Sequence, residues 1–288
     1  MYLKTAGETN RLCIVTALPA ETRPFLDKWH GKALSLRGLR AYECQDYLLV
    51  QTGLGKLNAA ASVAAMLQAH PEIHCIVNIG IAGARLTLGT LLLAHSVCDE
   101  ATGQRWFPHL PDPRELPASL RSMPTGSIVS VDQPNTDYQK GYVFDMEASG
   151  LFAAATRHLS SSQVQCIKIV SDNPDAPITV NNKKLLARQA QTLLNDRIEQ
   201  IEAILDYFAT QGSPTDNKVR RQAMGECEKI AQAVHHTHSE TVLLIRQIEQ
   251  LISLETDPQT DQCLRMQTAT EVRLHLEKLR SAATLSYA

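Results

Sequence analysis

Short apolar runs alternate with longer amphipathic stretches along the chain as far as about residue 210. The runs are nearly continuous in hydrophobic residues, which is typical of strands buried on both faces of a parallel sheet. We predict strands over residues 12–16, 47–52, 74–79, 91–98, 127–131 and 164–170. We predict helices over residues 20–29, 57–69, 146–158 and 182–210. Strands that alternate with helices in this way indicate a mostly parallel α/β sheet covered on both faces.

The pattern changes near residue 213, after which apolar positions recur only at helical spacing. Turn-forming residues over 211–217 predict a linker. We predict three further helices, over residues 218–234, 239–254 and 263–279, with Ser239 as an N-cap. The chain is therefore expected to divide into an α/β domain, residues 1–212, and a C-terminal helical domain, residues 213–288. The helices are expected to bury one another's apolar stripes; oligomerisation, partner docking or a lid over the substrate are the alternatives.

Composition and charge restrict the partners, the compartment and the cysteine chemistry that we expect. The chain has 288 residues, 44% of them hydrophobic, and a net charge of −2, which gives no electrostatic reason to expect nucleic acid or an anionic membrane as a partner. The sequence contains neither an apolar leader nor a run of transmembrane length, so we expect a cytoplasmic protein. Seven scattered cysteines predict reduced, buried thiols rather than a disulfide framework or a zinc site.

Two acidic residues stand at the ends of predicted elements. Asp172 closes the strand 164–170, and Glu147 lies at the start of the helix that precedes this strand. In an open α/β sheet, ligands collect at the carboxyl ends of strands. A buried acid there is suited to donating a proton, and a glutamate at a helix start is suited to binding hydroxyls. Glu21 follows the first strand; taken alone it is typical of a helix N-terminal charge, and it gains meaning only if it converges with the other two acids.

Two glycine-containing segments follow predicted strands. Residues 53–56, Gly-Leu-Gly-Lys, lack the spacing of a phosphate loop, and Leu57 stands where a hydroxyl would be needed, so we interpret them as a tight turn. Residues 80–83, Gly-Ile-Ala-Gly, are expected to form a turn after the third strand, and their glycines would allow a ligand to approach the backbone closely. One group of histidines comprises His235, His236 and His238. It has no cysteine or carboxylate partner at metal-binding spacing, and we expect neither a metal site nor a cofactor.

Five segments, taken in order, resemble the nucleoside phosphorylase/nucleosidase superfamily, whose hydrolytic members include methylthioadenosine/S-adenosylhomocysteine nucleosidase and futalosine hydrolase. The segments are residues 16–21 (TALPAE), 52–60 (TGLGKLNAA), 78–84 (NIGIAGA), 145–148 (DMEA) and 170–175 (VSDNPD). The resemblance covers about residues 12–210. It implies a three-layer α/β/α fold around a mixed central sheet and a homo-oligomer, with a dimer favoured.

The resemblance also implies roles for individual residues. Asp172 resembles the acid that protonates or hydrogen-bonds purine N7, and Glu147 resembles the carboxylate that holds the ribose hydroxyls. Met146 resembles the residue packed on the face of the sugar. Glu21 resembles the water-activating glutamate of the hydrolases. The remaining substrate-binding residues are expected to be Ile81, Ala82, Gly83 and Ser171.

The chain also departs from the pattern of the superfamily. Phosphorylases bind phosphate with a glycine-containing N-terminal loop and with an arginine and a serine near the third strand. The corresponding positions here are Asn78 and Ile81, and no glycine lies within residues 16–21. Because isoleucine offers a phosphate dianion no hydrogen-bond donor and no positive charge, water is the expected nucleophile. Pro134 stands where a base-stacking aromatic is expected; the candidates to line the pocket instead are Tyr138, Tyr142, Trp106 and Phe107.

These observations predict an N-ribosyl hydrolase that acts on a 5′-substituted purine nucleoside, with adenine the favoured base. Candidate substrates are 5′-methylthioadenosine, S-adenosylhomocysteine, 5′-deoxyadenosine or a larger adduct. Cleavage of an N-glycoside passes through a cationic sugar and an anionic leaving base, so a proton for the base and negative charge near the sugar both accelerate it. Two alternatives stay open: a catalytically degenerate nucleoside-binding scaffold or partner-docking protein, and a purine nucleoside phosphorylase.

Overall fold

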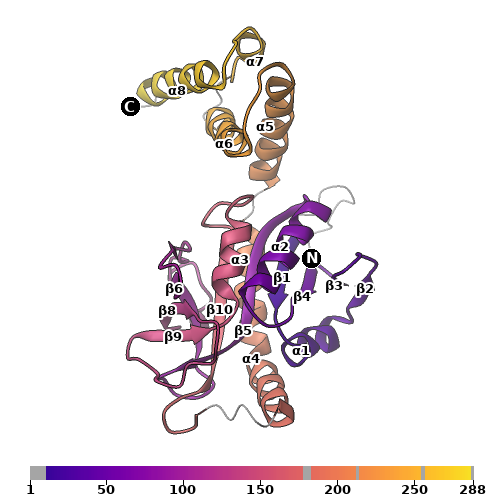
Figure 1. Ribbon diagram of the computed structural model, residues 1–288, viewed down its shortest axis with the longest axis vertical. Helices are drawn as coiled ribbons and strands as arrows, with labels where there is room; N and C mark the ends of the chain where they lie inside the picture. Colours follow the sequence, from indigo (N-terminus) through magenta and orange to yellow (C-terminus); the bar gives the residue numbers. More distant parts are fainter. Residues whose placement is uncertain (1–10, 178–182, 212–213, 254–256, 287–288) are drawn as a thin grey trace. The chain divides into compact units, whose positions relative to one another are not determined.

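The computed structural model describes residues 11–177, 183–211, 214–253 and 257–286. The chain divides into two compact units, Met1–Gly212 and Ser213–Ala288. The first unit combines strands and helices, and the second consists of helices and their connections (Figure 1).

One mixed sheet of ten strands organises the first unit. Its strands are β1 Arg11–Thr16, β2 Lys32–Leu34, β3 Arg40–Cys44, β4 Tyr47–Gln51, β5 Ile73–Ala84, β6 Leu91–Asp99, β7 Arg105–Trp106, β8 Thr125–Ser130, β9 Tyr142–Asp145 and β10 Val164–Asp172. Their order is β10-β6-β8-β9-β5-β1-β4-β3-β2, with β7 paired to β6. Because β10 also pairs with β5, the strands β5, β10, β6, β8 and β9 close into a ring, which gives this part of the sheet a barrel-like form.

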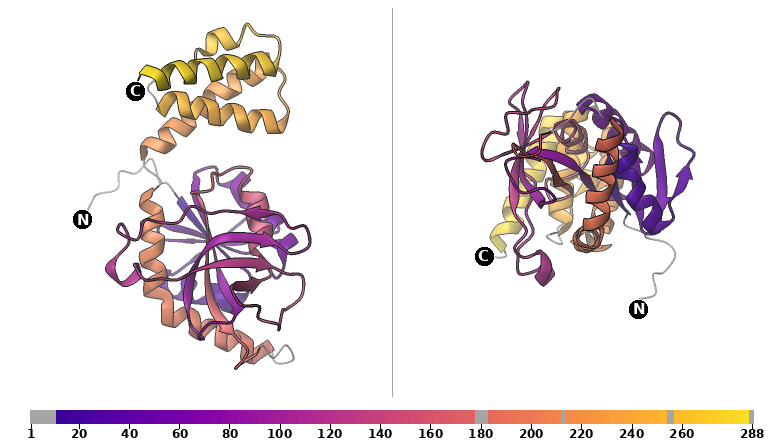
Figure 2. Two further views of the ribbon diagram at one scale, coloured as in Figure 1. Left: turned by 90° about the vertical axis from the view of Figure 1, so that its left-hand side faces the viewer. Right: turned by 90° about the horizontal axis from the view of Figure 1, so that it is seen from below.

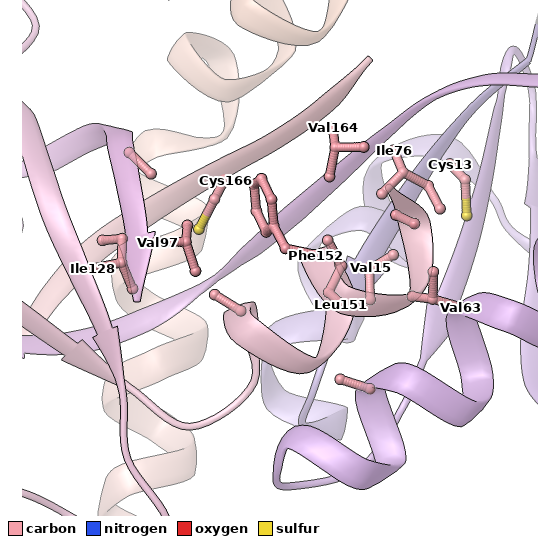
Figure 3. Close-up of a cluster of buried hydrophobic side chains, with 14 of the residues drawn as sticks. Cys13, Val15, Val63, Ile76, Val97, Ile128, Leu151, Phe152, Val164 and Cys166 are labelled. Carbon is pink, nitrogen blue, oxygen red and sulfur yellow. The ribbon is translucent and has the colours of Figure 1, made fainter. Parts of the chain in front are cut away.

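Helices cover both faces of the sheet (Figure 2). They are α1 Pro19–Trp29, α2 Lys56–Ala69, α3 Ala148–Ala155 and α4 Lys183–Gln211, with a short 3-10 helix at Ala118–Leu120. Successive residues of β1 show why both faces are apolar: Cys13 and Val15 pack with α2 and α3 (Figure 3), whereas Leu12 and Ile14 pack with α1 and α4. Side chains alternate between the two faces of a strand, so a continuous apolar run supplies both cores. The structure therefore has the three-layer α/β/α fold with a mixed sheet that we predicted.

The strand β5 is longer than predicted. We expected it to end at residue 79 and to turn at residues 80–83, but it continues to Ala84. Residues 80–83 pair with β10 on one side, and Gly83 and Ala84 pair with β9 on the other. Hydrogen-bonding partners on both sides keep the glycine-rich segment extended. The prediction of a turn here was therefore wrong.

The other predicted strands and helices of this unit are present, with shifted ends. The helix predicted over 146–158 spans only Ala148–Ala155, and residue 182, where the last helix was predicted to begin, lies outside the described residues. Four short strands were not predicted: β2, β3, β7 and β9.

The second unit contains α5 Pro214–Ala233, α6 His238–Ser253, α7 Thr260–Cys263 and α8 Ala269–Ser286. The described apolar side chains form one core; its buried members are Ala223, Cys227, Ile230, Val234, Leu244, Ile248, Leu251, Cys263, Val272 and Leu276. The helices thus bury one another's apolar stripes, as their spacing predicted.

Three details of this unit differ from prediction. Gln211 still belongs to α4 and α5 begins at Pro214, so the linker predicted over 211–217 is wrong at both ends, and residues 212–213 lie outside the described residues. The helix α6 begins at His238, so its N-cap is Thr237 rather than Ser239. The Glu240 amide donates a hydrogen bond to Thr237 Oγ1 at 3.3 Å, and the Thr237 amide donates one to Glu240 Oε2 at 2.8 Å. The helix predicted over 263–279 is interrupted between α7 and α8.

Two general properties follow from the described residues. None of their helices combines the length and apolar character that crossing a bilayer requires. All seven cysteines lie within the described residues, where they are buried and form no disulfide, as predicted.

Candidate functional site

Two predicted acids lie against the glycine-containing half of β5. A Cβ atom built on Gly80 would lie 2.7 Å from Glu21 Oε1, and one built on Gly83 would lie 2.7 Å from Asp172 Oδ2. Both distances are shorter than ordinary contacts of a Cβ atom, so each position needs glycine because a carboxylate occupies the adjoining space. Two acids far apart in sequence therefore meet at one stretch of a single strand.

Glu21 lies in the first turn of α1, where it is 3% exposed. Its Oε2 atom accepts hydrogen bonds from the amides of Ala17 at 2.9 Å and Leu18 at 2.8 Å, and its Oε1 atom accepts one from the amide of Ile81 at 3.0 Å. The side chain thus joins the start of α1 to β5: it is a helix N-terminal charge, as its position alone indicates, but a buried one. A carboxylate has about four acceptor positions, so these three bonds leave about one of them.

Asp172 ends β10, and both of its oxygens accept hydrogen bonds from hydroxyl groups. Ser171 donates to Oδ1 at 2.6 Å, and Tyr138 donates to Oδ2 at 2.7 Å. Asp172 is buried, as is Tyr138, which comes from the connection between β8 and β9. The candidate proton donor is therefore held in one orientation from both sides.

Of the four aromatic residues that were candidates for the pocket, the described contacts bring only Tyr138 to the acid. Phe107 and Tyr142 are 65% and 37% exposed. Trp106 packs on Phe152, with 6.4 Å between the ring centroids, on the α3 side of the sheet.

Glu147 directly precedes α3 and reaches the turn before α2. Its Oε1 atom accepts a hydrogen bond from the amide of Gly55 at 2.8 Å. Gly55 has φ +96°, a backbone conformation that favours glycine, so the turn that presents this amide depends on it. Burial raises the pKa of Glu147 to about 7; the charges of Asp145 and Glu21 act in the same direction and that of Lys168 opposes them. Glu147 and Glu21 therefore lie within electrostatic range of each other.

A buried ion pair that we did not predict lies beside these acids. Lys168 Nζ lies 2.9 Å from Asp145 Oδ2, and the side chains are 1% and 0% exposed. Burial alone would lower the pKa of Lys168, but the carboxylates around it, Asp145 foremost, raise it, so the lysine stays charged. A Cβ on Gly80 would lie 3.6 Å from Nζ, which places the cation next to Glu21. The one signal in the sequence is a lysine in the middle of a strand that is mostly apolar.

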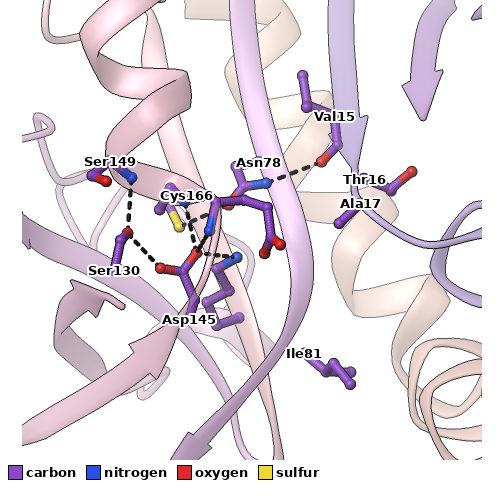
Figure 4. A network of polar contacts seen from close by, with 12 residues as sticks. Val15, Thr16, Ala17, Asn78, Ile81, Ser130, Asp145, Ser149 and Cys166 are labelled. Atoms are coloured by element: carbon purple, nitrogen blue, oxygen red, sulfur yellow. Dashed lines mark hydrogen bonds and ion pairs between the residues drawn. The ribbon is translucent and has the colours of Figure 1, made fainter. Parts of the chain in front are cut away.

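Asp145 also organises the start of α3 (Figure 4). Its Oδ2 atom accepts a hydrogen bond from the Ala148 amide at 2.8 Å, and its Oδ1 atom accepts one from the Ser130 hydroxyl at 2.6 Å. The Ser149 amide donates to the Ser130 oxygen at 2.8 Å. One carboxylate therefore fixes both the buried lysine and the helix start that carries Glu147.

Lys56, the last residue of the segment 53–56, forms ion pairs with two carboxylates. Its Nζ atom lies 2.9 Å from Asp99 Oδ2 and 2.8 Å from Asp132 Oδ1. Burial would raise the pKa of Asp99, but hydrogen bonds from Lys56, Ser149 and Thr102 lower it to about 2. The arrangement fits the predicted tight turn and offers no phosphate loop.

The positions that differ from the phosphorylase pattern present no positive charge. Asn78 is buried; its amide nitrogen donates to the Val15 carbonyl at 3.2 Å, and its Oδ1 atom accepts a bond from the Cys166 thiol at 3.5 Å (Figure 4). Ile81 and Met146 are partly exposed, while Ala82 is buried. Across the residues that the structure describes, no three histidine, cysteine or acidic side chains are grouped so that they could hold a metal ion.

Comparison with solved structures identifies the fold as that of nucleoside phosphorylases and nucleosidases. A 5′-methylthioadenosine/S-adenosylhomocysteine nucleosidase from Colwellia psychrerythraea 34H, in complex with adenine, is 18% identical over 67% of this chain and 96% of its own, with a TM-score of 0.53. The corresponding enzyme from Neisseria meningitidis, in complex with methylthio-immucillin-A, is 19% identical over 66% of this chain and 99% of its own (TM-score 0.52). Futalosine hydrolase from Helicobacter pylori is 14% identical over 67% of this chain and 98% of its own (TM-score 0.50). No protein-family model matches the sequence, and no curated protein does.

Proposed function

We propose that the first unit is a nucleosidase, an N-ribosyl hydrolase that cleaves a 5′-substituted purine nucleoside with water and favours adenine as the base. The convergence of Glu21, Glu147 and Asp172 around one half of β5 carries this proposal. The fold supports it, since solved nucleosidases share that fold.

Asp172 is the proposed proton donor to the leaving base. Departure of the purine leaves negative charge on its ring, and a hydrogen bond or proton at N7 relieves that charge. The hydroxyl of Ser171 keeps Oδ1 in place, so Oδ2 is the oxygen that faces the base. A positioned general acid typically contributes about 10²–10⁴-fold to the rate.

Glu147 and Glu21 are the proposed partners of the sugar and the water. Glu147 Oε1 accepts the hydrogen bond from the Gly55 amide, which leaves Oε2 to accept hydrogen bonds from the ribose hydroxyls. The negative charge of Glu147 stabilises the cationic sugar of the transition state. Met146 is proposed to pack on the sugar face, with Ile81 and Ala82 on the β5 side. Glu21 keeps about one acceptor position, enough to orient a single water molecule.

Water is the proposed nucleophile because Asn78 and Ile81, which stand at the phosphate-binding positions, do not offer phosphate the groups that it requires, and Lys168 is paired with Asp145. Asn78 directs both ends of its amide into contacts within the protein, and Ile81 provides an apolar side chain. Binding a phosphate dianion requires several donors or a positive charge.

The test is release of free base by the purified full chain. We expect cleavage of at least one of 5′-methylthioadenosine, S-adenosylhomocysteine and 5′-deoxyadenosine in phosphate-free buffer. Chromatography measures the free base that is released. Asp172→Asn should reduce the rate by about 10²-fold or more. Asp175→Asn is the matched control, because Asp175 is exposed just beyond the same strand. Full activity of Asp172→Asn would exclude the mechanism, and a strict need for phosphate would favour a phosphorylase.

One observation favours a second candidate, a nucleoside-binding scaffold without turnover. The Tyr138 hydroxyl occupies the Asp172 oxygen that would face the base, and Pro134 replaces the expected stacking aromatic. Tight nucleoside binding by calorimetry without release of base would support the scaffold. The same preparations, measured by light scattering, test the proposed homodimer.

A further inference from the structure

The connection between β8 and β9 is held to the site by one buried side chain. Residues 132–142 are exposed except for Asn135, which is partly exposed, and Tyr138, which is 2% exposed. Residues 131–141 contain no helix or strand. Because most of its side chains are exposed, this connection buries little apolar surface. Its position against the site, called the closed position below, therefore depends on Tyr138.

The Tyr138 ring lies beside Asp172 Oδ2, the oxygen that would face the base in the proposed function. A Cβ built on Gly83 would meet Asp172 Oδ2 at 2.7 Å and Tyr138 Cε1 at 3.1 Å. The ring edge, the acid and the bare strand backbone therefore surround the same point. The Tyr138 hydroxyl also donates a hydrogen bond to Oδ2, whereas Ser171 donates to Oδ1.

The backbone around Tyr138 is suited to movement. Tyr138 has φ +45°, a conformation that non-glycine residues rarely adopt, so its closed position carries strain. Gly141, just before β9, has φ +90° and tolerates a change of direction. The start of the connection is anchored separately, because Asp132 lies 2.8 Å from Lys56. A rotation about these two ends would withdraw Tyr138 and leave the strands in place.

We propose that Tyr138 is a tethered competitor of the nucleoside base for Asp172. This proposal rests on the proposed function and adds a gating step to it. Because the Tyr138 ring occupies the space beside Oδ2 and Gly83, Tyr138 must move away, breaking its hydrogen bond, before a purine can bring N7 to Oδ2. Ser171 cannot give way in the same manner, because it is the neighbouring residue in β10. Apparent affinity for the base is then the intrinsic affinity reduced by the fraction of molecules in which Tyr138 is withdrawn.

Tyr138→Phe removes the tether, which is the hydrogen bond from the Tyr138 hydroxyl to Asp172, and keeps the aromatic ring. A typical hydrogen bond corresponds to about a two- to tenfold effect on an equilibrium, so we expect the dissociation constant of adenine to fall by about that factor. Tyr138→Ala removes the ring as well and should bind adenine at least as tightly as Tyr138→Phe. Tyr142→Phe, the same chemical change at an exposed position four residues away, should behave as wild type.

The experiment combines adenine calorimetry with a readout that needs no ligand. Brief trypsin digestion, followed by mass spectrometry, measures cleavage after Lys140, an exposed residue of the same connection. We expect faster cleavage in both Tyr138 variants than in wild type and Tyr142→Phe. Weaker adenine binding or slower base release in Tyr138→Phe would overturn the proposal and make Tyr138 part of the base site. If no variant binds adenine, the proposed function fails, and unchanged cleavage after Lys140 would independently overturn the tether.

Discussion

Replacing Glu147 with glutamine tests whether this carboxyl keeps its proton up to neutral pH in the folded protein. Its pKa is raised from 4.5 to about 7, first by burial and then by the charge of Asp145, against the opposing charge of Lys168. Glutamine has nearly the same shape and can still accept the hydrogen bond from the Gly55 amide, but it does not ionise.

The sign follows from the direction of the shift. Between about pH 4.5 and pH 7 the folded protein holds a proton that the unfolded chain has released, so stability falls as pH rises through this window. For a shift of this size, the free energy of unfolding that Glu147 contributes falls by about 2–3 kcal/mol between pH 5 and pH 8. Glu147→Gln lacks this contribution. The free energy of unfolding of the variant relative to that of wild type should therefore be higher at pH 8 than at pH 5 by about that amount.

Denaturant unfolding followed by tryptophan fluorescence measures this difference. Both tryptophans, Trp29 and Trp106, lie in the first unit, so the signal reports on the unit that contains Glu147. Glu100→Gln, the same change at an exposed side chain, controls for the loss of one negative charge. A stability difference between wild type and Glu147→Gln that is equal at pH 5 and pH 8 would refute the reasoning.

The same group predicts how substrate affinity depends on pH. Ribose hydroxyls donate to the ionised form of Glu147, which is lost as pH falls below about 7. For the proposed nucleosidase, KM should therefore rise roughly fivefold between pH 7 and pH 6. A KM that is constant over this range would show that the carboxylate does not bind the sugar.

Three further substitutions test the packing around the site. Gly83→Ala places a Cβ 2.7 Å from Asp172 Oδ2, so base release should fall at least about tenfold while unfolding free energy drops by about 1–3 kcal/mol; normal turnover would contradict the assigned geometry. Gly150→Ala places a Cβ 2.0 Å from a backbone oxygen of α2, and denaturant unfolding should show a loss of about 3 kcal/mol; a neutral result would mean that α2 and α3 separate easily. Lys168→Met leaves Asp145 as an uncompensated buried charge and should cost about 3–5 kcal/mol at pH 7, partly recovered by adding Asp145→Asn; no recovery would place the loss elsewhere.

Most of the fold could be predicted because buried strands and amphipathic helices leave periodic patterns in the sequence. The run at residues 12–15 illustrates this, since alternate residues supply the two cores. The strands β2 and β9 escaped prediction because they are short and follow polar, turn-rich connections. Their strand conformation depends on pairing with distant neighbours, which local pattern does not record.

The candidate site could be predicted only in part. Strand ends and helix starts are visible in sequence, and they indicated Glu147 and Asp172. The partners of these acids depend on contacts between distant segments: Tyr138 reaches Asp172 across 34 positions, and Lys168 reaches Asp145 across the sheet. A lysine in an apolar strand signals a buried partner but does not identify it.

The glycines of β5 illustrate both what the sequence could predict and what it could not. The sequence indicated close approach to the backbone at residues 80–83, and we interpreted it as a turn open to a ligand. The groups that approach are the protein's own carboxylates, Glu21 at Gly80 and Asp172 at Gly83. A nucleoside at this strand would therefore meet acids already set by hydrogen bonds, and at Asp172 it would meet Tyr138 first. If Tyr138 acts as proposed, chemistry at this site depends on how readily its hydroxyl is withdrawn.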